Sequence, residues 1–433
     1  MPIAIHERLI RPARNIYGTL RMPGDKSISH RYGLLGGFAQ GVSRFTNFST
    51  GADCASTLAC MTALGANVDR TGADSVAIHG VAGRVNPPQR PLDCGNSGST
   101  IRMISGLLAP QSGRFTLIGD ASLSRRPMER IRQPLAEMGA RIALTQGHAP
   151  IAIEGAHLHA IDFATPVPSA QVKSAILFAG LQTAGATTVR ESVRTRDHSE
   201  LALRAFGAAV TRTVDSVSIP GPQQLHAIDA AIPGDLSSAA FFLCAALLFP
   251  GSTLVIDSLG LNPTRAALLD VLTTLGARIS VLNLEEKHSE LVGVVQITQR
   301  PEGLASAEIF GALSAQLIDE LPVLAAIAPY TVGGVRIRGA RELRIKESDR
   351  IALVAKNLRA MGASVTEFED GLDVPGNQPL HGAAIDSGGD HRIAMAFSVA
   401  ALRAHGETLI QGADSAAISF PEFFDLLDQV AER

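Results

Sequence analysis

The sequence predicts an α/β protein made of two similar domains. Along its 433 residues, a turn rich in Gly, Ser or Asp, an apolar Ala-rich helix and a closing Gly recur six times. A short β-like run and a polar turn follow each copy. One such unit of about 70 residues cannot bury its own amphipathic surface, and six are too many for one core, which favours three repeats in each of two domains.

The six apolar helices begin with polar residues and carry few charges along their length. Their segments start at Gly24, Gly95, Val167, Pro233, Ile318 and Gly388. In five copies a second helix ends in Gly-Ala, as in PLAEMGARI and KNLRAMGASV, and the sixth copy stops at a final helix, PEFFDLLDQV. We expect each of these five glycines to close its helix in the left-handed conformation and the residues after it to begin a strand.

The domain boundaries follow from the spacing of the repeats, which changes around the fourth copy. This change predicts that the chain crosses between the domains near Gly234–Leu236. The strand-like segment before Gly24 is expected to join the C-terminal half. The predicted domains are therefore residues 1–23 together with 236–433, and residues 24–235.

The composition excludes several classes of protein. Lys and Arg number 38 and Asp and Glu 41, there is no Trp, and only three residues are Tyr. This balance argues against a general nucleic-acid binder and against a polybasic membrane-surface protein. The longest apolar run, Ala239–Phe249, is about half of a membrane-spanning helix, and the N-terminal segment has charged residues but no cleavage signal. We expect a cytoplasmic protein.

Cysteine and histidine spacing argues against a metal site. The four cysteines lack CxxC spacing, so we interpret them as buried thiols in a reducing compartment: Cys54, Cys60, Cys94 and Cys244. Three histidines lie near the polar turns: His30, His198 and His391. None of them shares helical spacing with another histidine and a carboxylate partner, so we expect hydrogen-bonded positioning residues and no metal.

Basic residues recur at equivalent positions of separate repeats. On the first helices they are Lys26, Arg31, Arg102 and Arg392, and in the turns that follow they are Arg125, Arg126, Arg196, Lys346 and Arg350. Helix N-termini present free N–H groups and a partial positive charge, which suit phosphate or carboxylate. A single Asp or Ser there is explained by N-capping, as at Asp235, and a single Arg by solvation. The recurrence instead predicts a shared anion-binding cleft.

Two carboxylates stand out among these cations. Asp319, with Glu320, opens the fifth helix, where capping is a sufficient explanation; Glu347 lies between Lys346 and Arg350, where an ion pair is sufficient. A carboxylate among cations is also how an acid/base group is held, so both interpretations stay open. The GDKS segment lacks the GxxxxGK[ST] spacing, and no GxGxxG follows a strand, which argues against ATP and dinucleotide sites.

Nine motifs, in order and spacing, resemble the EPSP synthase family, the 5-enolpyruvylshikimate-3-phosphate synthases of the shikimate pathway. They are PGDKSISHR, LDCGNSGSTIRM, SRRPMERI, PSAQVKSAIL, TRDHSE, IDELPVLA, LRIKESDRI, DHRIAMAF and SFPEFF. The resemblance extends from about Pro12 to Phe424 and is strongest to bacterial members with GDKSISHR and TRDHSE. It implies the enolpyruvyl transferase fold, in which two domains, each of three βαβαββ repeats around a pseudo-three-fold axis, are hinged around an interdomain cleft.

The resemblance also implies a reaction of aromatic amino acid biosynthesis. The enolpyruvyl group of phosphoenolpyruvate moves to the 5-hydroxyl of shikimate 3-phosphate through a tetrahedral intermediate, and phosphate is released. No metal or organic cofactor is implied. The expected partners are these two small molecules, with no nucleic acid or membrane, and a monomer is expected. Glyphosate, an inhibitor of the family, is expected to act because Gly98 leaves room beside the phosphoenolpyruvate site.

Site residues are carried over motif by motif. The implied ligands of shikimate 3-phosphate are Lys26, Ser27, Arg31, Ser169, Ala170, Gln171, Arg196, Asp319 and Lys346. The implied ligands of phosphoenolpyruvate are Lys26, Asn96, Gly98, Arg126, Gln171, Arg350 and Arg392. Asp319 is implied to take the 5-hydroxyl proton, and either Glu347 or Lys26 to protonate the methylene carbon.

Some positions depart from the family pattern. Ile418 stands where many members have Lys, so one phosphoenolpyruvate contact is missing or supplied elsewhere. Glu342 stands where some members have Asn, and Ser97 and Ser99 replace Ala and Thr of some relatives. The sister enzyme that acts on UDP-N-acetylglucosamine is disfavoured because GDASLSRRP lacks its reactive Cys. A repeat scaffold that binds anions without chemistry is the non-enzyme alternative.

Overall fold

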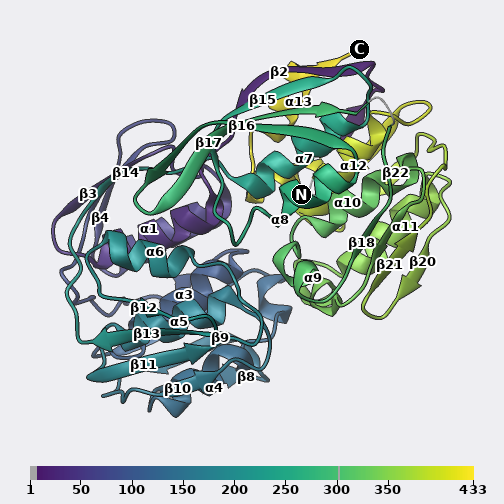
Figure 1. Cartoon of the computed structure of the whole chain (residues 1–433). Coiled ribbons are helices and arrows are strands. Elements are labelled where there is room, and N and C mark those ends of the chain that lie inside the picture. Colours follow the sequence, from purple (N-terminus) through teal and green to yellow (C-terminus); the bar gives the residue numbers. More distant parts are fainter. Residues whose placement is uncertain (1–6, 301–302) are drawn as a thin grey trace. The chain divides into compact units, whose positions relative to one another are not determined.

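The computed structural model describes residues 7–300 and 303–433, which form two compact units (Figure 1). Unit 1 comprises the chain up to Pro23 together with Pro233–Arg433, and unit 2 comprises Gly24–Ile232. The return to unit 1 at Pro233 lies close to the crossing that the repeat spacing predicts near Gly234–Leu236. Residues 1–6, which that prediction assigns to the first domain, lie outside the described residues.

Unit 2, all of which the structure describes, contains three four-stranded sheets of one design. In the order β6-β7-β9-β8, the first two strands are parallel and the others are antiparallel to their neighbours. The orders β10-β11-β13-β12 and β14-β3-β5-β4 repeat this pattern. The strands are β3 (Val42–Thr46), β4 (Asn67–Arg70), β5 (Val76–His79), β6 (Leu92–Asp93), β7 (Arg114–Ile118), β8 (Arg141–Thr145), β9 (His148–Glu154), β10 (Asp162–Ala164), β11 (Gly185–Arg190), β12 (Thr211–Arg212), β13 (Ser216–Gly221) and β14 (Asp229–Ala231).

The helices of unit 2 are of two kinds. The first helices of the repeats, α1 (Lys26–Phe38), α3 (Gly98–Leu108) and α5 (Ala170–Gly180), are buried along most of their length, which explains their lack of charge. Helices α3 and α5 pack so closely that a Cβ on Gly106 would lie 2.0 Å from the Ala175 carbonyl oxygen. The other helices are α2 (Ala52–Ala63), η1 (Leu123–Arg125), α4 (Glu129–Glu137) and α6 (His198–Ala205).

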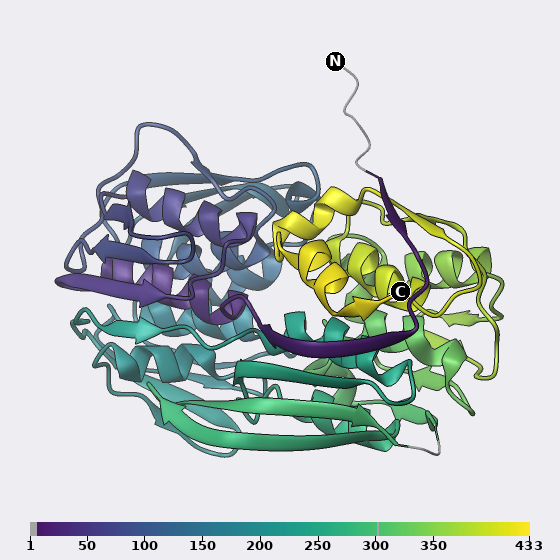
Figure 2. The ribbon, with the colours of Figure 1, turned by 90° about the horizontal axis from the view of Figure 1, so that it is seen from above.

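The described part of unit 1 contains three more sheets. Strands β16, β17, β15, β2 and β24 lie side by side in the largest sheet (Figure 2). The order β18-β19-β21-β20 repeats the pattern of unit 2, and β1-β23-β22 completes the set. The strands are β1 (Arg8–Ile10), β2 (Asn15–Arg21), β15 (Thr253–Gly260), β16 (Ala277–Lys287), β17 (Glu290–Gln299), β18 (Ala307–Ile309), β19 (Val335–Ile337), β20 (Thr366–Phe368), β21 (Gly371–Val374), β22 (Ala384–Asp386), β23 (Thr408–Gln411) and β24 (Ala431–Glu432).

The helices of unit 1 differ from the prediction in one repeat. Instead of a single long helix from Ile318, the fifth repeat has α9 (Ala312–Gln316), α10 (Leu321–Ile327) and the 3-10 turn η2 (Ala328–Tyr330). Pro322 lies in the first turn of α10, and Pro329, which lacks an N–H, lies where the helix gives way to η2. The others are α7 (Leu236–Leu247), α8 (Ala267–Thr274), η3 (Arg341–Ile345), α11 (Arg350–Ala360), α12 (His391–Ala401), η4 (Ala413–Ile418) and α13 (Phe423–Val430).

The predicted ends of the second helices are confirmed. The glycines that close them, Gly65, Gly139, Gly207, Gly276 and Gly362, have φ angles of 106°, 99°, 94°, 111° and 93°. These angles lie in the region that L side chains rarely adopt, so each Gly ends its helix and turns the chain toward the next strand.

The strand before each crossing between the units pairs within the unit that the chain is leaving. Strand β2 leads into α1 of unit 2, but it pairs in parallel with β15 of unit 1. Strand β14 leads into α7 of unit 1, but it pairs in parallel with β3 of unit 2. Strand β1 also pairs with β23, so the described strands before Gly24 pair with strands that follow Pro233.

The cysteine prediction is confirmed in part. All four cysteines lie within the described residues, and each is buried and unpaired. Burial raises the pKa of the Cys54 and Cys244 thiols. Among the described residues, each helix is either too short or too polar to cross a membrane.

Candidate active-site residues

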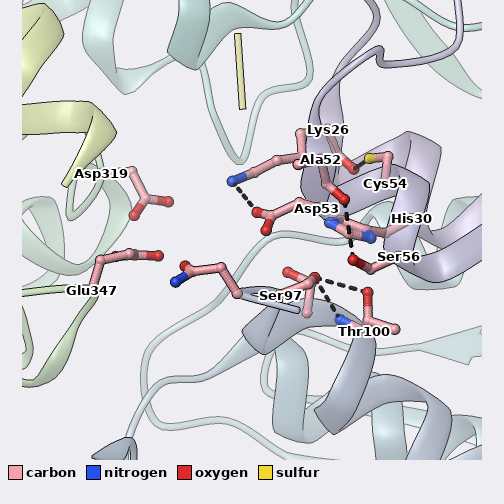
Figure 3. A network of polar contacts seen from close by, with 12 residues as sticks. Lys26, His30, Ala52, Asp53, Cys54, Ser56, Ser97, Thr100, Asp319 and Glu347 are labelled. Carbon is pink, nitrogen blue, oxygen red and sulfur yellow. Dashed lines mark hydrogen bonds and ion pairs between the residues drawn. The ribbon is translucent and has the colours of Figure 1, made fainter. Parts of the chain in front are cut away.

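In unit 2, Lys26 stands at the start of α1. The Asp25 carboxylate caps this helix by accepting a hydrogen bond from the Ile28 N–H at 2.9 Å. The Lys26 ammonium lies 2.9 Å from Asp53 Oδ2 (Figure 3), and its side chain is 18% exposed. Lys26 is thus held by a carboxylate from α2 and keeps part of its surface accessible.

Arg31, one turn further along α1, is buried and bonded inside the unit. Its Nε donates to Ser199 Oγ at 2.6 Å, one terminal nitrogen donates to Ser174 Oγ at 3.0 Å, and the other donates to the Ser27 carbonyl oxygen at 2.8 Å. Arg31 therefore joins α1 to the starts of α5 and α6. Its implied contact with shikimate 3-phosphate stays a prediction.

The start of α3 gathers three of the residues implied for phosphoenolpyruvate. Ser97 caps this helix by accepting from the Thr100 N–H at 3.1 Å. Arg126, which follows η1, donates to Asn96 Oδ1 at 2.7 Å, and Asn96 donates to Asp120 Oδ2 at 2.7 Å. A Cβ on Gly98 would lie 3.1 Å from a terminal nitrogen of Arg126. The Gly leaves the guanidinium of Arg126 close to the free N–H groups of the helix.

Gln171, on α5, joins the same cluster through Arg102. Its Oε1 accepts from Arg102 at 2.7 Å, and its Nε2 donates to Ser99 Oγ at 2.9 Å. A Cβ on Gly98 would also lie 3.1 Å from a terminal nitrogen of Arg102. Arg102 was noted as a recurring basic residue but not included in the predicted site, although its i+4 spacing from Gly98 places it on the same helix face.

The remaining implied residues of unit 2 lie at two helix starts. Ser169 caps α5 by accepting from the Val172 N–H at 3.4 Å, and Ala170 is the first residue of that helix. Capping is thus a sufficient explanation for Ser169. Arg196 is half-buried in the segment between Glu191 and Asp197. Glu191 anchors one end of that segment because its carboxylate lies 2.9 Å from the Lys173 ammonium, which is fully buried.

In unit 1, Asp319 lies among cations and does not cap α10. The N-cap position of that helix is Glu320, whose side chain makes no capping hydrogen bond. Asp319 Oδ1 lies 3.4 Å from Lys346 Nζ and 3.6 Å from a terminal nitrogen of Arg350. Arg392, on α12, donates to the Asp319 backbone carbonyl oxygen at 2.7 Å. The N-cap position of α10 is therefore Glu320, and the Asp319 carboxylate lies among cations.

Arg350 lies at the centre of three carboxylates. It is 1% exposed, and its Nε lies 2.8 Å from Asp390 Oδ2, while one terminal nitrogen lies 2.5 Å from Glu347 Oε2. Burial lowers the pKa of Arg350, but the charges of Asp390, Glu347 and Asp319 outweigh it and raise that pKa above its usual range. Asp390 also caps α12 by accepting from the Arg392 N–H at 2.9 Å. Asp390 is not among the predicted site residues, because an Asp at a helix start is explained by capping alone.

Around Arg350, unit 1 thus offers cations paired with carboxylates. The helix starts of unit 2 offer hydrogen-bond donors. No three His, Cys, Asp or Glu side chains in residues 7–300 and 303–433 are grouped so that they could hold a metal ion. Helix N-termini with arginine forks suit phosphate and carboxylate groups. Carboxylates held by cations suit proton transfer.

Comparisons with solved structures define the class of fold. A solved EPSP synthase from Acinetobacter baumannii superimposes with a TM-score of 0.86 at 38% identity and covers 98% of both chains. The enolpyruvyl transferase NikO from Streptomyces tendae gives a TM-score of 0.75 at 20% identity, also over 98% of both chains. The fold is that of the enolpyruvyl transferases.

Sequence comparisons define the family. The model of the family described as EPSP synthase (3-phosphoshikimate 1-carboxyvinyltransferase) matches residues 10–427. A relative in Koribacter versatilis, named 3-phosphoshikimate 1-carboxyvinyltransferase, is 61% identical over 98% of this chain and 99% of its own. A relative of the same name in Solibacter usitatus is 51% identical over 98% of this chain. The chain belongs to the EPSP synthase family, as the nine motifs indicate.

Proposed function

We propose that this chain transfers the enolpyruvyl group of phosphoenolpyruvate to the 5-hydroxyl of shikimate 3-phosphate and releases phosphate. The observation that carries the proposal is the cluster at the start of α3. Asn96, Gly98, Arg126 and Gln171 come from three separate motifs, and all four gather there with Arg102. Two guanidinium groups beside a helix N-terminus are suited to the phosphate and carboxylate of phosphoenolpyruvate.

Binding is the first task of the cations. Both substrates are multiply charged anions, so bringing them into contact requires fixed positive charges. We propose that Lys26, Ser27, Arg31, Ser169, Ala170, Gln171 and Arg196 bind shikimate 3-phosphate, together with Asp319 and Lys346. We propose that Asn96, Gly98, Arg126 and Gln171 bind phosphoenolpyruvate, together with Lys26, Arg350 and Arg392. Residues of both units then act on the same two substrates.

Addition is the first chemical step. The 5-hydroxyl oxygen forms a bond to carbon 2 of phosphoenolpyruvate, its proton passes to Asp319, and the methylene carbon takes a proton from Glu347 or Lys26. The adduct is tetrahedral at carbon 2. The contacts of Asp319 with Lys346 and Arg350 support its role, since they hold the carboxylate in a fixed position.

Elimination completes the reaction. Phosphate leaves carbon 2 of the adduct together with the proton that Asp319 took up. The methyl group returns one proton to the group that donated it, which restores the enol double bond in the product. Arg126 and Arg102 beside the start of α3 support departure of the phosphate, because fixed donors stabilise the charge that develops on it.

A coupled assay of phosphate release tests the proposal. We expect release only when phosphoenolpyruvate and shikimate 3-phosphate are both present. Release from phosphoenolpyruvate alone, or none with both substrates, would contradict the assignment and favour a phosphatase or a binding scaffold. Glyphosate at millimolar concentration is expected to inhibit, and an uninhibited enzyme would refute the interpretation of Gly98.

Two further proposals concern the protein as a whole. We propose a cytoplasmic location, which the four buried, unpaired thiols support because thiols persist in reducing compartments. We also propose that the enzyme acts as a monomer, and sedimentation of the full chain tests this. A concentration-dependent dimer would contradict it.

A further inference from the structure

We propose that a buried chain of four side chains positions the start of α3 relative to α1. The chain runs from His30 through Thr57 and Thr100 to Ser97. This inference rests on the proposed function, because α1 carries implied ligands of shikimate 3-phosphate and the start of α3 carries implied ligands of phosphoenolpyruvate. His30 and Thr57 are thereby positioning residues that touch neither substrate.

The four side chains form a continuous series of short contacts. His30 Nδ1 lies 2.7 Å from Thr57 Oγ1, which lies 2.6 Å from Thr100 Oγ1, and Thr100 Oγ1 lies 2.8 Å from Ser97 Oγ. His30 belongs to α1, Thr57 to α2 and Thr100 to α3, so three helices are joined. Figure 3 shows the last link of the series, between Thr100 and Ser97. All four residues are fully buried, which excludes water as a competing partner.

The direction of the hydrogen bonds follows from the one proton that each hydroxyl can donate. Thr100 donates its hydroxyl proton to Ser97 Oγ. Thr57 must then donate to Thr100, and His30 must donate from Nδ1 to Thr57. The chain therefore requires the Nδ1–H tautomer of His30.

The surroundings of His30 favour the same tautomer independently. His30 Nε2 is buried and has no hydrogen-bond partner among the described residues. A proton on Nε2 would be an unsatisfied buried donor, which is costly. Burial, followed by the charges of Lys26 and Arg31, lowers the pKa of His30 well below its ordinary value, so the ring stays neutral. If the hydrogen bonds ran in the opposite direction, Nδ1 would accept from Thr57, and the proton of the neutral ring would lie on Nε2.

The chain ends at the residue that shapes the candidate site. Ser97 Oγ accepts from both Thr100 Oγ1 and the Thr100 N–H at 3.1 Å, so the last link is also the cap of α3. Asn96 and Gly98 are its sequence neighbours. Thr57, midway along the chain, is the position where the link between α1 and this cap can be cut without touching either end.

Substitution of Thr57 tests the positioning role in the full-length enzyme. Thr57→Val keeps the shape but removes the hydroxyl, and we expect the KM for phosphoenolpyruvate to rise about five- to thirtyfold because buried groups lose their partners. The KM for shikimate 3-phosphate should change less than about twofold, because the chain ends at the cap of α3. Thr57→Ser, which keeps the hydroxyl, should restore most of the affinity.

Thr187→Val is the matched control. Thr187 is also a buried threonine of unit 2, on β11, and its hydroxyl has no hydrogen-bond partner among the described residues. Loss of the Thr187 hydroxyl should leave the KM values for both substrates unchanged. Equal KM values for Thr57→Val and the unmodified enzyme, or equal rises for the two substrates, would contradict the positioning role.

Nitrogen-15 NMR of the histidines tests the direction of these hydrogen bonds without any assay of activity. We expect His30, assigned by the signal lost in His30→Asn, to show the Nδ1–H tautomer at pH 7. The Nε2–H tautomer or the charged ring would overturn the proposal. If the unmodified chain releases no phosphate, the proposed function fails, while the NMR result still decides whether the hydrogen bonds run as inferred.

Discussion

The two units use one repeat design, but the arginines described at the helix starts of unit 2 and Arg350 of unit 1 have different partners. In unit 2, hydroxyl, amide and carbonyl groups supply the hydrogen bonds described for Arg31, Arg102 and Arg126. In unit 1, carboxylates surround Arg350, and one of them also faces Lys346. Hydroxyl, amide and carbonyl oxygens orient a guanidinium without carrying a full negative charge, whereas Lys26 of unit 2 is held by the Asp53 carboxylate. A cation bonded to carboxylates instead keeps those carboxylates ionised.

This difference indicates that the two units have different tasks in the proposed reaction. Both units bring helix starts together, so both can attract anions. In unit 1, Asp319, Glu347 and Asp390 surround Arg350, and such carboxylates are suited to moving protons. Unit 2 is then suited to holding phosphate and carboxylate groups. Four predictions test this division, and they follow in order of decreasing effect.

The largest effect is expected at the carboxylate proposed as the base. Asp319→Asn removes the proton acceptor but keeps the shape of the side chain. We expect kcat to fall by about 10²- to 10⁴-fold, the usual contribution of a positioned acid or base. Asp373→Asn, which breaks an exposed ion pair with Arg336 in the same unit, is the control and should keep full activity. Intact turnover in Asp319→Asn would remove the acid/base role from unit 1.

The second effect concerns stability. Asp390→Ala leaves Arg350 buried without its best partner, and we expect the free energy of unfolding to fall by about 3–5 kcal/mol. Asn96→Ala removes a neutral partner of Arg126 in unit 2 and should cost about 1 kcal/mol. Urea unfolding of both variants measures the contrast. Equal losses would mean that the two units do not differ in how they hold their cations.

The third effect depends on pH and on His30. The pKa of His30 is well below its ordinary value of 6.5 in the folded chain. Below pH 6.5 the unfolded chain therefore takes up a proton that the folded chain does not, so stability falls as the pH falls, by at most about 1.4 kcal/mol per pH unit. His30→Asn lacks this contribution. Urea unfolding from pH 7 to pH 5 should show a shallower decline for the variant, and parallel curves would contradict a neutral, buried ring.

The smallest effect is expected at Gly98. A Cβ there would lie 3.1 Å from nitrogens of Arg102 and Arg126, so both guanidinium groups must shift by a few tenths of an ångström. We expect Gly98→Ala to raise the KM for phosphoenolpyruvate about fivefold, equivalent to about 1 kcal/mol. The KM for shikimate 3-phosphate serves as the internal control. A shift in that value alone would place phosphoenolpyruvate elsewhere.

Local features of this fold could be predicted from the sequence, because they depend on neighbouring residues. The closing glycines, such as Gly65 and Gly362, follow from a backbone conformation that favours Gly. The apolar helices follow from the lack of charge along each repeat. The short α10 was not predicted, since the effect of Pro329 on its end was overlooked.

Contacts between distant segments could not be predicted from spacing. Gln171 reaches Arg102 across 69 positions, and Arg350 reaches Asp390 across 40. Such pairs depend on how whole helices pack, and a single sequence does not encode their partners in any periodic pattern. The motifs indicated the implied site residues. The residues that hold them in place, such as Asp390 and Thr57, were found only in the structure.

The pairing of the strands before Gly24 with strands near the end of unit 1 has a consequence for how the protein is made. Every strand of unit 2 lies between Gly24 and Ile232, so this unit can fold while the ribosome is still adding the rest. Strands β1 and β2 precede unit 2 along the chain, but their partners β23 and β24 follow it. The strands before Gly24 are therefore made well before these partners, and the pairs can form only after β23 and β24 have been synthesised.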